Sequence, residues 1–314
     1  MVDLSVTIGS VRLANPVMPG SGTFGEGMAQ AIDLNRLGAI VTKTITADVR
    51  EGNPPPRVAE FRDATLFSIG IPSKGARYYV DELVPFYRRY DVPLIASISA
   101  DSVEEFGELA AEISVPGVAA IEANVSCPNL RQDGQAFGMD ARATADVVRS
   151  MKRATSLPIW LKVTPNVGNV ADVARASEAA GADALVVANA LLAMAIDVET
   201  RRPKVASVMG GITGPATKPI ILRMAYQCAR AVSIPIIGCG GISTATDALE
   251  YILAGCTAIQ VGTASFVSAA AMLHVIDGLQ DYCERHDVTE IRSLIGALRT
   301  DVPDVLQQQN YAML

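Results

Sequence analysis

Residues 234–264, IPIIGCGGISTATDALEYILAGCTAIQVGTA, show most clearly how this chain is built. Two short apolar runs rich in β-branched residues, Ile234–Gly241 and Ala258–Ala264, flank the segment Thr244–Leu253, in which apolar residues recur with helical spacing. The helical segment is followed by Gly255, a residue type that commonly ends helices. The stretch therefore predicts a strand, a helix and a second strand parallel to the first.

The same alternation recurs along the preceding part of the chain. Eight strands separated by helices predict a closed (β/α)8 TIM barrel, and we expect residues 1–314 to form one domain with long loops over its mouth. An open Rossmann-type sheet is the alternative, but no GxGxxG motif follows the first predicted strand. The other predicted strands are Asn15–Gly22, Gly38–Lys43, Leu94–Ser99, Ala120–Cys127, Ile159–Thr164 and Ala184–Ala190, and the other predicted helices are Val103–Ile113, Ala141–Ala154, Val170–Ala180 and Ala216–Ala231.

Two of the predicted connections are longer than a plain strand-to-helix loop. They cover Ala47–Tyr90 after the second strand and Leu191–Pro215 after the sixth. Connections at the C-terminal ends of barrel strands carry the functional residues of this fold. We therefore expect these two segments to cover a substrate at the mouth of the barrel.

Composition limits the classes of function that the chain can have. Half of the 314 residues are hydrophobic, only 5% are aromatic, and the net charge is −7, which favours neither nucleic acid nor an anionic membrane surface as a partner. No apolar stretch reaches the roughly 18 residues of a membrane span, and no signal-peptide pattern follows Met1. Five cysteines that never occur as CxxC argue against disulfides, zinc and iron–sulfur clusters. We expect a cytoplasmic protein without a metal site.

Glycines follow the last two predicted strands, at Gly240, Gly241 and Gly262, and Thr263 comes directly after the last of them. The backbone N–H groups of such turns bind phosphate together with the N-terminus of the next helix. Barrels of this kind often carry a phosphate site after strands seven and eight. Glycines can also simply cap strands, but their presence after both strands favours a bound phosphate.

Polar side chains occur at the ends of the other strands, where packing alone would not place them, and a barrel would bring them together at one mouth. Lys162 lies within an apolar strand, and burying its ammonium without a partner would be costly. It fits a cation that stabilises the negative charge of a reduced flavin, and the alternative is a structural ion pair. Lys43 allows the same two interpretations. The polar residues are Ser21, Lys43, Ser97, Asn124, Cys127, Asn129, Lys162 and Asn189.

Cys127 is the predicted acid–base residue. Both histidines, His274 and His286, fall in the C-terminal helical region, away from any strand end. Cys127 instead follows the fourth strand, within the segment Asn124–Asn129 (NVSCPN) and ahead of a loop that contains glycines. A buried, inert cysteine is the alternative, and that interpretation suits other cysteines of the chain better.

A set of short motifs runs along nearly the whole chain. The motifs are Ser21–Gly25 (SGTFG), Val41–Thr44 (VTKT), Gly52–Arg57 (GNPPPR), Asn124–Asn129 (NVSCPN), Gly134–Gly138 (GQAFG), Met194–Asp197 (MAID), Gly210–Pro215 (GGITGP) and the glycines of strands seven and eight. Together they resemble the class 1 dihydroorotate dehydrogenases, and most closely the catalytic subunit of the type that works with a separate electron-transfer subunit.

The resemblance implies an FMN cofactor across the barrel mouth and the oxidation of dihydroorotate to orotate in pyrimidine biosynthesis. The family's cysteine base corresponds to Cys127, which would take a proton from C5 of the substrate while C6 gives a hydride to flavin N5. The implied FMN contacts are Ser21, Lys43, Thr44, Ser97, Asn124, Lys162, Ala188 and Gly214, with the phosphate on Gly240, Gly241, Gly262 and Thr263. The implied substrate contacts are Lys43, Phe67, Ile69, Gly70, Ile71, Asn124, Asn129, Asn189 and Ala190.

The sequence departs from the family pattern at positions that hold the substrate. Phe67 stands where the family motif Asn-x-x-Gly-Leu begins, Ser73 replaces a second asparagine, and Ala190 replaces a hydroxyl residue. Missing polar partners lower activity on a polar substrate strongly. One alternative is therefore a diverged FMN dehydrogenase or reductase that acts on a different cyclic amide or ene-carbonyl compound. An alternative from another class is a non-catalytic, flavin-binding barrel subunit.

The electron acceptor also leaves alternatives. The chain has no cluster-type cysteines and no nicotinamide motif, so reduction of NAD would need a partner subunit that carries FAD and an iron–sulfur centre, as the resemblance implies. Fumarate or oxygen acting directly on FMN is the other route. The resemblance also implies a homodimer.

Overall fold

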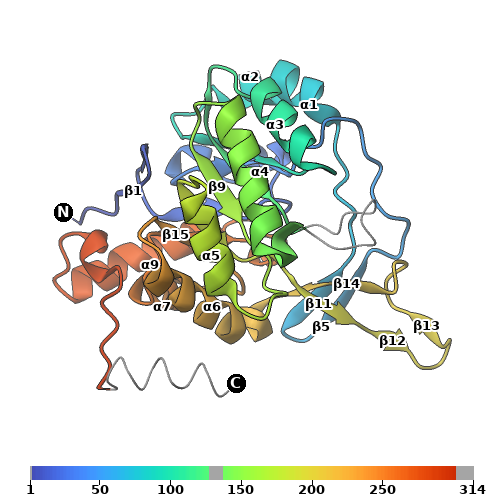
Figure 1. The fold of residues 1–314 in the computed structure, drawn as a ribbon. Coiled ribbons are helices and arrows are strands. Elements are labelled where there is room, and N and C mark those ends of the chain that lie inside the picture. Colours follow the sequence, from blue (N-terminus) through green and yellow to red (C-terminus); the bar gives the residue numbers. More distant parts are fainter. Residues whose placement is uncertain (1, 127–136, 302–314) are drawn as a thin grey trace.

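The computed structural model describes residues 2–126 and 137–301, and its central feature is an eight-stranded parallel sheet (Figure 1). Each strand lies beside the next one along the chain, and the last strand pairs in parallel with the first. At the seam between the first two strands, the Gly38 N–H donates to the Val17 carbonyl at 2.8 Å. The sheet is therefore the predicted (β/α)8 barrel. Its strands are β3 (Val17–Pro19), β4 (Ile40–Val41), β7 (Leu94–Ile98), β8 (Val118–Asn124), β9 (Ile159–Lys162), β10 (Ala184–Val187), β15 (Ile236–Cys239) and β16 (Ala258–Val261).

All eight predicted strands are confirmed, and each is shorter than the apolar run that predicted it. β8 begins at Val118, two residues before its predicted start. The barrel strands are buried on both faces, as in the fully buried β7 and β9, which explains their nearly continuous apolar sequences. Polar residues such as Lys43 and Asn189 lie just past the strands, in the connections at the mouth.

Helices cover the outside of the barrel (Figure 1) and begin where the sequence provides capping residues. Asp140 accepts a hydrogen bond from the Ala143 N–H at the start of α4, and Thr244 forms a capping box with Asp247 at the start of α7. The helices are α1 (Gly75–Tyr78), α2 (Val84–Tyr87), α3 (Val103–Glu112), α4 (Ala141–Ala154), α5 (Val170–Ala179), α6 (Lys218–Ala231), α7 (Ala245–Leu253), α8 (Ala264–Val267) and α9 (Ala271–Arg285). Short turns are the π-helical η3 (Tyr79–Leu83) and the 3-10 helices η1 (Glu26–Gln30), η2 (Leu34–Arg36), η4 (Phe137–Met139), η5 (Pro215–Thr217) and η6 (Ile291–Leu294).

The two long connections pair with each other in an antiparallel sheet, which we call the added sheet. It contains β5 (Val58–Phe61) and β6 (Ala64–Phe67) from the first connection and β11 (Leu191–Met194) and β14 (Met209–Thr213) from the second, in the order β11-β14-β6-β5. The two long connections are present as predicted, and they contain short strands that the sequence analysis did not identify. Their strands are short, and the β6–β14 pairing joins residues far apart in the chain, so no local pattern announces it.

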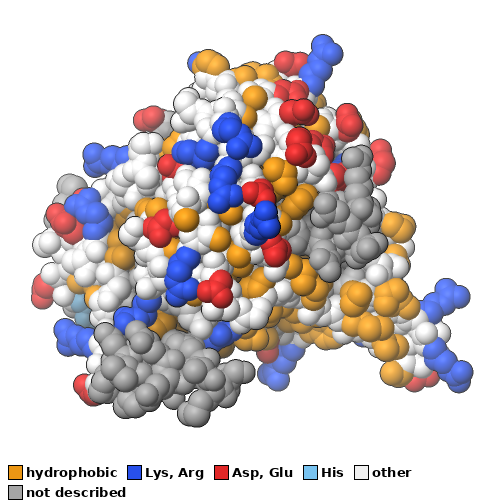
Figure 2. Space-filling view, in the orientation of Figure 1, with side chains coloured by type: hydrophobic (Ala, Val, Ile, Leu, Met, Phe, Trp, Pro, Cys, Tyr) orange, Lys and Arg blue, Asp and Glu red, His pale blue; other side chains and the backbone are white. Residues whose placement is uncertain are grey.

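A small hairpin of β12 (Ile196–Asp197) and β13 (Arg202–Pro203) extends the added sheet away from the barrel (Figure 1). Hydrophobic side chains gather at the surface of this region (Figure 2). A contiguous exposed apolar surface is typical of a region that contacts another molecule. The exposed residues are Leu192, Met194, Ile196, Val198, Val208 and Met209. Within residues 2–126 and 137–301, no helix is long and apolar enough to cross a membrane.

Candidate functional site

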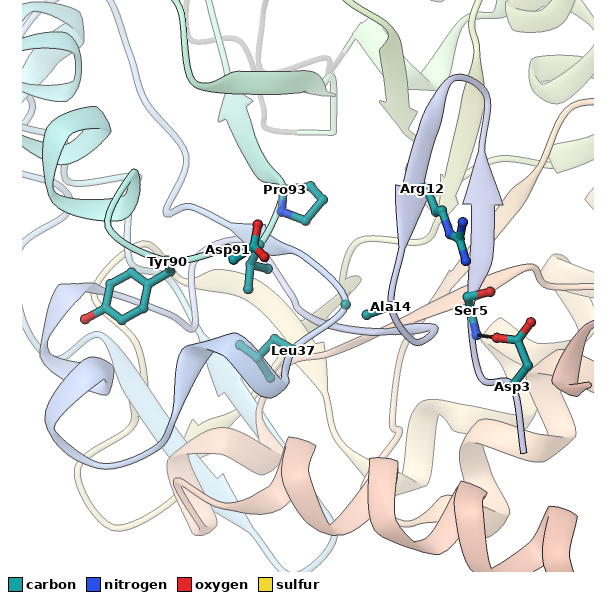
Figure 3. A pocket seen from close by; sticks show the side chains of 10 residues that line it. Asp3, Ser5, Arg12, Ala14, Leu37, Tyr90, Asp91 and Pro93 are labelled. Atoms are coloured by element: carbon teal, nitrogen blue, oxygen red, sulfur yellow. Dashed lines mark hydrogen bonds between the residues drawn. The ribbon is translucent and has the colours of Figure 1, made fainter. Parts of the chain in front are cut away.

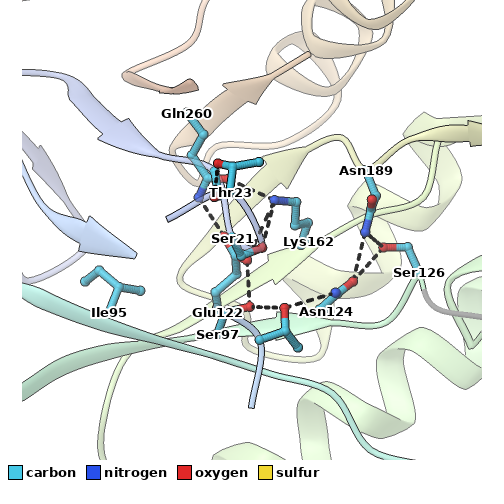
Figure 4. A network of polar contacts seen from close by, with 12 residues as sticks. Ser21, Thr23, Ile95, Ser97, Glu122, Asn124, Ser126, Lys162, Asn189 and Gln260 are labelled. Carbon is cyan, nitrogen blue, oxygen red and sulfur yellow. Dashed lines mark hydrogen bonds and ion pairs between the residues drawn. The ribbon is translucent and has the colours of Figure 1, made fainter. Parts of the chain in front are cut away.

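The C-terminal mouth of the barrel brings together polar residues from strands that are distant in sequence (Figure 4). Asn124 and Lys162 end the neighbouring strands β8 and β9, where they lie directly opposite each other in the register. Ser97 lies in β7, Ser21 follows β3, and Asn189 follows β10. This is the convergence that the strand-end pattern predicted.

Lys162 is the centre of a buried network (Figure 4). Its Nζ donates to Gln260 Oε1 at 2.9 Å and to Ser21 Oγ at 3.2 Å, and lies 3.8 Å from Glu122 Oε1. Burial alone would lower the pKa of Lys162, but interactions with Cys239 and Glu122 raise the pKa by more, so it lies above its ordinary value. Lys162 is therefore a charged ammonium. It forms an ion pair with Glu122 and donates a hydrogen bond to the hydroxyl of Ser21.

A second group of polar side chains joins β8 to the loop after β10. Asn189 Nδ2 donates to Asn124 Oδ1 at 3.0 Å and to Ser126 Oγ at 2.6 Å. Asn124 Nδ2 lies 3.5 Å from Thr44 Oγ1, and the Thr44 hydroxyl lies 3.1 Å from that of Ser97. Two of the amides predicted to hold the substrate are thus in contact, and they connect with the network around Lys162.

Lys43 is a half-buried cation at the start of the loop after β4. Burial lowers the pKa of Lys43. Among the residues that the structure describes, its ammonium has no hydrogen-bond or ion-pair partner. Since its neighbour Thr44 belongs to the polar network, Lys43 is a cation at the mouth that can pair with an anionic ligand.

The glycine turns after β15 and β16 lie next to each other, and we call them the glycine cradle. The two strands pair in parallel, so their turns lie side by side. In the described part of the chain, the backbone N–H groups of these turns donate to no protein acceptor. A Cβ added to Gly262 would have only Thr23 Cγ2 within 4 Å, at 3.8 Å, so the space beside Gly262 is open. Free N–H groups and open space suit a bound phosphate. The N–H groups belong to Gly240, Gly241, Gly262 and Thr263.

The Gly241 turn is held tightly against its surroundings. Gly241 has a φ of +67°, and a Cβ there would come within 2.7 Å of the carbonyl oxygen of Gly214, another predicted cofactor residue. Beside the turn, Lys218 Nζ forms ion pairs with Asp247 at 2.7 Å and Glu250 at 2.8 Å. The Lys218 ammonium is thus already paired with two carboxylates beside the turn.

Phe67 and Ala190, the two departures from the family pattern that concern substrate contacts, meet in space. A Cβ added to Gly211 would lie 2.7 Å from the Ala190 methyl and 3.3 Å from Phe67 Cζ, so both side chains pack over Gly211. The Ala190 N–H donates to Asn189 Oδ1 at 2.8 Å. An apolar wall of Phe67, Ala190 and Gly211 therefore borders the amide pair at the mouth.

The predicted substrate contacts Ile69, Gly70 and Ile71 form a half-buried turn after β6. The Asn53 N–H donates to the Ile69 carbonyl at 2.9 Å, and a Cβ on Gly70 would lie 2.5 Å from the Asn53 backbone nitrogen. Among the described contacts, no hydrogen bond or ion pair joins this turn to the Lys162 network. Their role as substrate contacts stays a prediction.

The remaining predicted residues divide into two groups. Ala188 is buried directly after β10, where its N–H donates to the Cys239 carbonyl at 2.9 Å. Cys127 and Asn129, the predicted base and a predicted substrate contact, lie outside the described residues. The described residues contain no group of three or more His, Cys, Asp or Glu side chains that could hold a metal ion.

Three residues of the network escaped the sequence reasoning: Glu122, Gln260 and Ser126. Glu122 and Gln260 are fully buried within the otherwise apolar strands β8 and β16. A charged or amide side chain in an apolar strand is the signal that singled out Lys162, and the same signal could have found both. Ser126 lies within the motif Asn124–Asn129 but has no predicted role there. Its hydroxyl donates to Asn124 Oδ1 at 2.8 Å.

A hollow of ≈ 680 Å³ opens at the opposite end of the barrel (Figure 3). It is lined by Asp3, Ser5 and Arg12 near the N-terminal hairpin of β1 (Val6–Ile8) and β2 (Val11–Leu13), and by residues that lead into β4 and β7, such as Pro93. Since barrel chemistry occurs at the C-terminal ends of the strands, this hollow is not the candidate active site.

Comparisons with known proteins agree with this geometry. The family model for dihydroorotate dehydrogenase matches residues 3–283. The chain is 47% identical over 299 residues to a Desulforamulus reducens protein and 48% identical over 298 residues to one from Trichlorobacter lovleyi, and each alignment covers 94% of this chain and 98% of the relative. It is 43% identical to a Thermoanaerobacter pseudethanolicus protein over 96% of this chain and the whole relative. All three relatives are named dihydroorotate dehydrogenase B (NAD(+)), catalytic subunit.

Proposed function

This chain belongs to the dihydroorotate dehydrogenase family, and on that premise we propose that it oxidises dihydroorotate to orotate in pyrimidine biosynthesis, with FMN as its cofactor. Members of the family are oxidoreductases that act on CH–CH bonds. The main support for the proposal is that three groups suited to a flavin and a polar ring lie at one barrel mouth. A buried, charged Lys162 lies at the same mouth as the glycine cradle with free N–H groups and the paired amides of Asn124 and Asn189.

The residues of the mouth fit FMN. The N–H groups of the glycine cradle would hold its phosphate, and Lys162, Asn124 and Thr44 would face its ring system. When bound, FMN supplies the acceptor for a hydride from the substrate. A cation fixed by Gln260 and Glu122 stabilises negative charge at the ring without having to reorganise.

Substrate binding would fall to the amides and to Lys43. Asparagine offers both donors and an acceptor, which suits a ring of alternating N–H and C=O groups, so Asn124 and Asn189 would orient the dihydropyrimidine. Lys43, which has no described protein partner, would pair with the carboxylate of the substrate. Cys127 would take the proton from C5, with Asn129 beside it in sequence.

We further propose that the chain works as a homodimer with an electron-transfer subunit that carries FAD and an iron–sulfur centre. The relatives' names, which designate a catalytic subunit and NAD(+), support a partner. The exposed apolar side chains around the β12–β13 hairpin support an assembly of more than one chain. The four described cysteines are unpaired, which supports a cytoplasmic location.

The proposal is tested by identifying the released flavin by mass and by following orotate formation from dihydroorotate with an artificial electron acceptor. We expect FMN and catalytic turnover. Lys43→Met should raise KM by about 10- to 100-fold, the loss expected for one charge-assisted hydrogen bond. The matched control is Lys204→Met, an exposed lysine in the second long connection, which should leave KM unchanged. Turnover by a protein without flavin would contradict the proposal.

A second candidate function is the oxidation or reduction of a different cyclic amide or ene-carbonyl compound by the same flavin site. The apolar wall of Phe67, Ala190 and Gly211 favours it, because this wall offers no side-chain hydrogen bond to a polar substrate. It predicts FMN binding without reduction by dihydroorotate. Screening less polar cyclic amides for loss of flavin absorbance tests it, and fast reduction by dihydroorotate contradicts it.

A further inference from the structure

Glu122 is a carboxylate buried in the middle of the barrel, where its exposed fraction is 0%. It lies in β8 among apolar residues, two positions before Asn124. A buried ion pair is often no more stabilising than apolar residues of the same volume, so stability alone does not account for a carboxylate here. The contacts of Glu122 indicate what it does.

Both oxygens of Glu122 are used. Oε1 accepts from the Ser97 hydroxyl at 3.0 Å and lies 3.8 Å from Lys162 Nζ. Oε2 accepts from Gln260 Nε2 at 2.6 Å. Because this bond commits the Gln260 amide nitrogen to Glu122, the amide oxygen must face Lys162, from which it accepts at 2.9 Å. Glu122 thus acts on Lys162 twice, through its charge and through the orientation of Gln260.

We propose that Glu122 is a positioning residue that keeps the Lys162 ammonium charged and fixed toward the mouth, whatever the charge of the cofactor beside it. The inference rests on the proposed function, because it assigns Lys162 to a flavin. With Glu122 present, Lys162 is protonated both before and after the flavin is reduced. Flavin reduction is therefore not coupled to proton uptake by Lys162.

The groups that face Lys162 support this assignment. Glu122 from β8 and Cys239 from β15 are the titratable groups that act on it, while Gln260 from β16 and Ser21 after β3 are neutral acceptors. Burial raises the pKa of the Cys239 thiol by more than Lys162 lowers it, so Cys239 is a neutral thiol at neutral pH. Glu122 is therefore the carboxylate that forms the ion pair with Lys162, at 3.8 Å.

The test replaces Glu122 by its neutral isostere and measures the midpoint potential of the bound FMN between pH 6 and 9, in the absence of substrate. In Glu122→Gln, burial favours neutral Lys162 while the flavin is oxidised, and the negative charge of the reduced flavin favours the ammonium. The electrons come from the reductant and one additional proton comes from water. We expect the potential to fall with pH more steeply than in the wild type, by about 30 mV per pH unit for one proton per two electrons.

Two comparisons isolate the role of Lys162. In a Lys162→Met background, Glu122→Gln should change the pH slope no further, because the group that gains the proton is absent. The matched control, Glu108→Gln on the exposed face of α3, should keep the wild-type slope. A wild-type slope in Glu122→Gln with FMN bound would overturn the inference and leave the proposed function standing. Failure of the wild type to bind FMN would instead refute the proposed function.

Should Glu122→Gln alone not fold, thermal unfolding of the apoprotein decides. A buried Lys162 amine without its ion-pair partner is then the expected cause, so the double variant Glu122→Gln/Lys162→Met should recover soluble protein that unfolds cooperatively on heating. Equal failure of the single and the double variant would mean that Glu122 does not act through Lys162.

Discussion

The Lys162 network and the added sheet meet at the same mouth, but they are built in different ways. Lys162, Glu122 and Gln260 lie on barrel strands, are at most 3% exposed, and pair their polar groups within the network. Phe67 lies on β6 and Ala190 directly before β11, both in the long connections. They are only half-buried and offer the site apolar side chains without hydrogen-bonding groups. Truncating one side chain of the first region leaves a buried polar group unpaired, whereas a side chain of the second region can change without disturbing the core.

This difference separates the two halves of the proposed activity. The cofactor half depends on the register of the barrel strands and on tight turns, so it is fixed by the same contacts that hold the fold together. The substrate half depends on a sheet formed by two insertions. We expect truncated side chains in the first half to weaken flavin binding or lower stability more often than isosteric changes do, and variants of the second half to change the substrate and keep the flavin.

The largest effect is expected at Cys127, the predicted base. Cys127→Ser should lower the rate of flavin reduction by about 10²- to 10⁴-fold, the usual contribution of a general base, because a serine hydroxyl hardly ionises at neutral pH. Stopped-flow absorbance of the anaerobic protein measures this rate. Flavin content serves as the control and should not change. A rate within a factor of about two of the wild type would remove Cys127 from the mechanism.

The apolar wall gives the next largest effect. Phe67→Asn combined with Ala190→Ser should raise kcat/KM for dihydroorotate by about 10- to 100-fold, because each change adds a polar partner beside Asn189. Steady-state kinetics at equal flavin content measures the change. An exposed change of the same kind, Phe61→Asn in β5, is the matched control and should have no effect. A loss of kcat/KM in the double variant would show that the wall fits dihydroorotate as it stands.

Gly241→Ala tests the phosphate cradle. A methyl group at φ +67°, 2.7 Å from the Gly214 carbonyl oxygen, should cost about 1–3 kcal/mol and weaken FMN retention. Equilibrium dialysis of FMN and thermal unfolding measure the two effects. Gly27→Ala is the control, since a Cβ there meets nothing within 4 Å. Unchanged FMN retention in Gly241→Ala would place the phosphate elsewhere.

The smallest effect is expected at Asp247, which fixes the cradle from the side. Burial raises the pKa of Asp247, but hydrogen bonds from Lys218, Ser243 and Thr244 lower the pKa by more, so it lies below its ordinary value of 3.8. A lowered carboxyl pKa contributes stability above the ordinary value, and this stability is lost as pH falls through the folded-state pKa. Asp247→Asn should therefore cost about 1 kcal/mol at pH 7 and less near pH 2. Denaturant unfolding at both pH values measures this, and an equal cost at both would contradict it.

The sequence predicted the parts of the molecule that follow local rules. The eight strands were recognisable because buried parallel strands are continuous apolar runs. The glycines after β15 and β16 were recognisable because barrels of this kind often bind phosphate after strands seven and eight. Lys162 stood out because an ammonium in an apolar strand needs a partner, and the structure provides Glu122 and Gln260.

The rest could not be predicted because it depends on contacts between distant segments. The pairing of Phe67 with Gly211 joins two insertions that carry no strong strand pattern, so the strands within these connections were not predicted. The meeting of Phe67 with Ala190 follows from that pairing and is invisible in either segment alone. The roles of Cys127 and Asn129 stay predictions, since both lie outside the described residues.

In the proposed mechanism, FMN and dihydroorotate bind together at one mouth of the barrel. Anaerobic mixing of the flavin-loaded protein with dihydroorotate, followed by flavin absorbance in a stopped-flow instrument, tests it most directly. We predict rapid loss of flavin absorbance with formation of one orotate per flavin. Bound FMN that stays oxidised at saturating dihydroorotate would contradict the claim, and would mean that the apolar wall around Phe67 serves a different substrate.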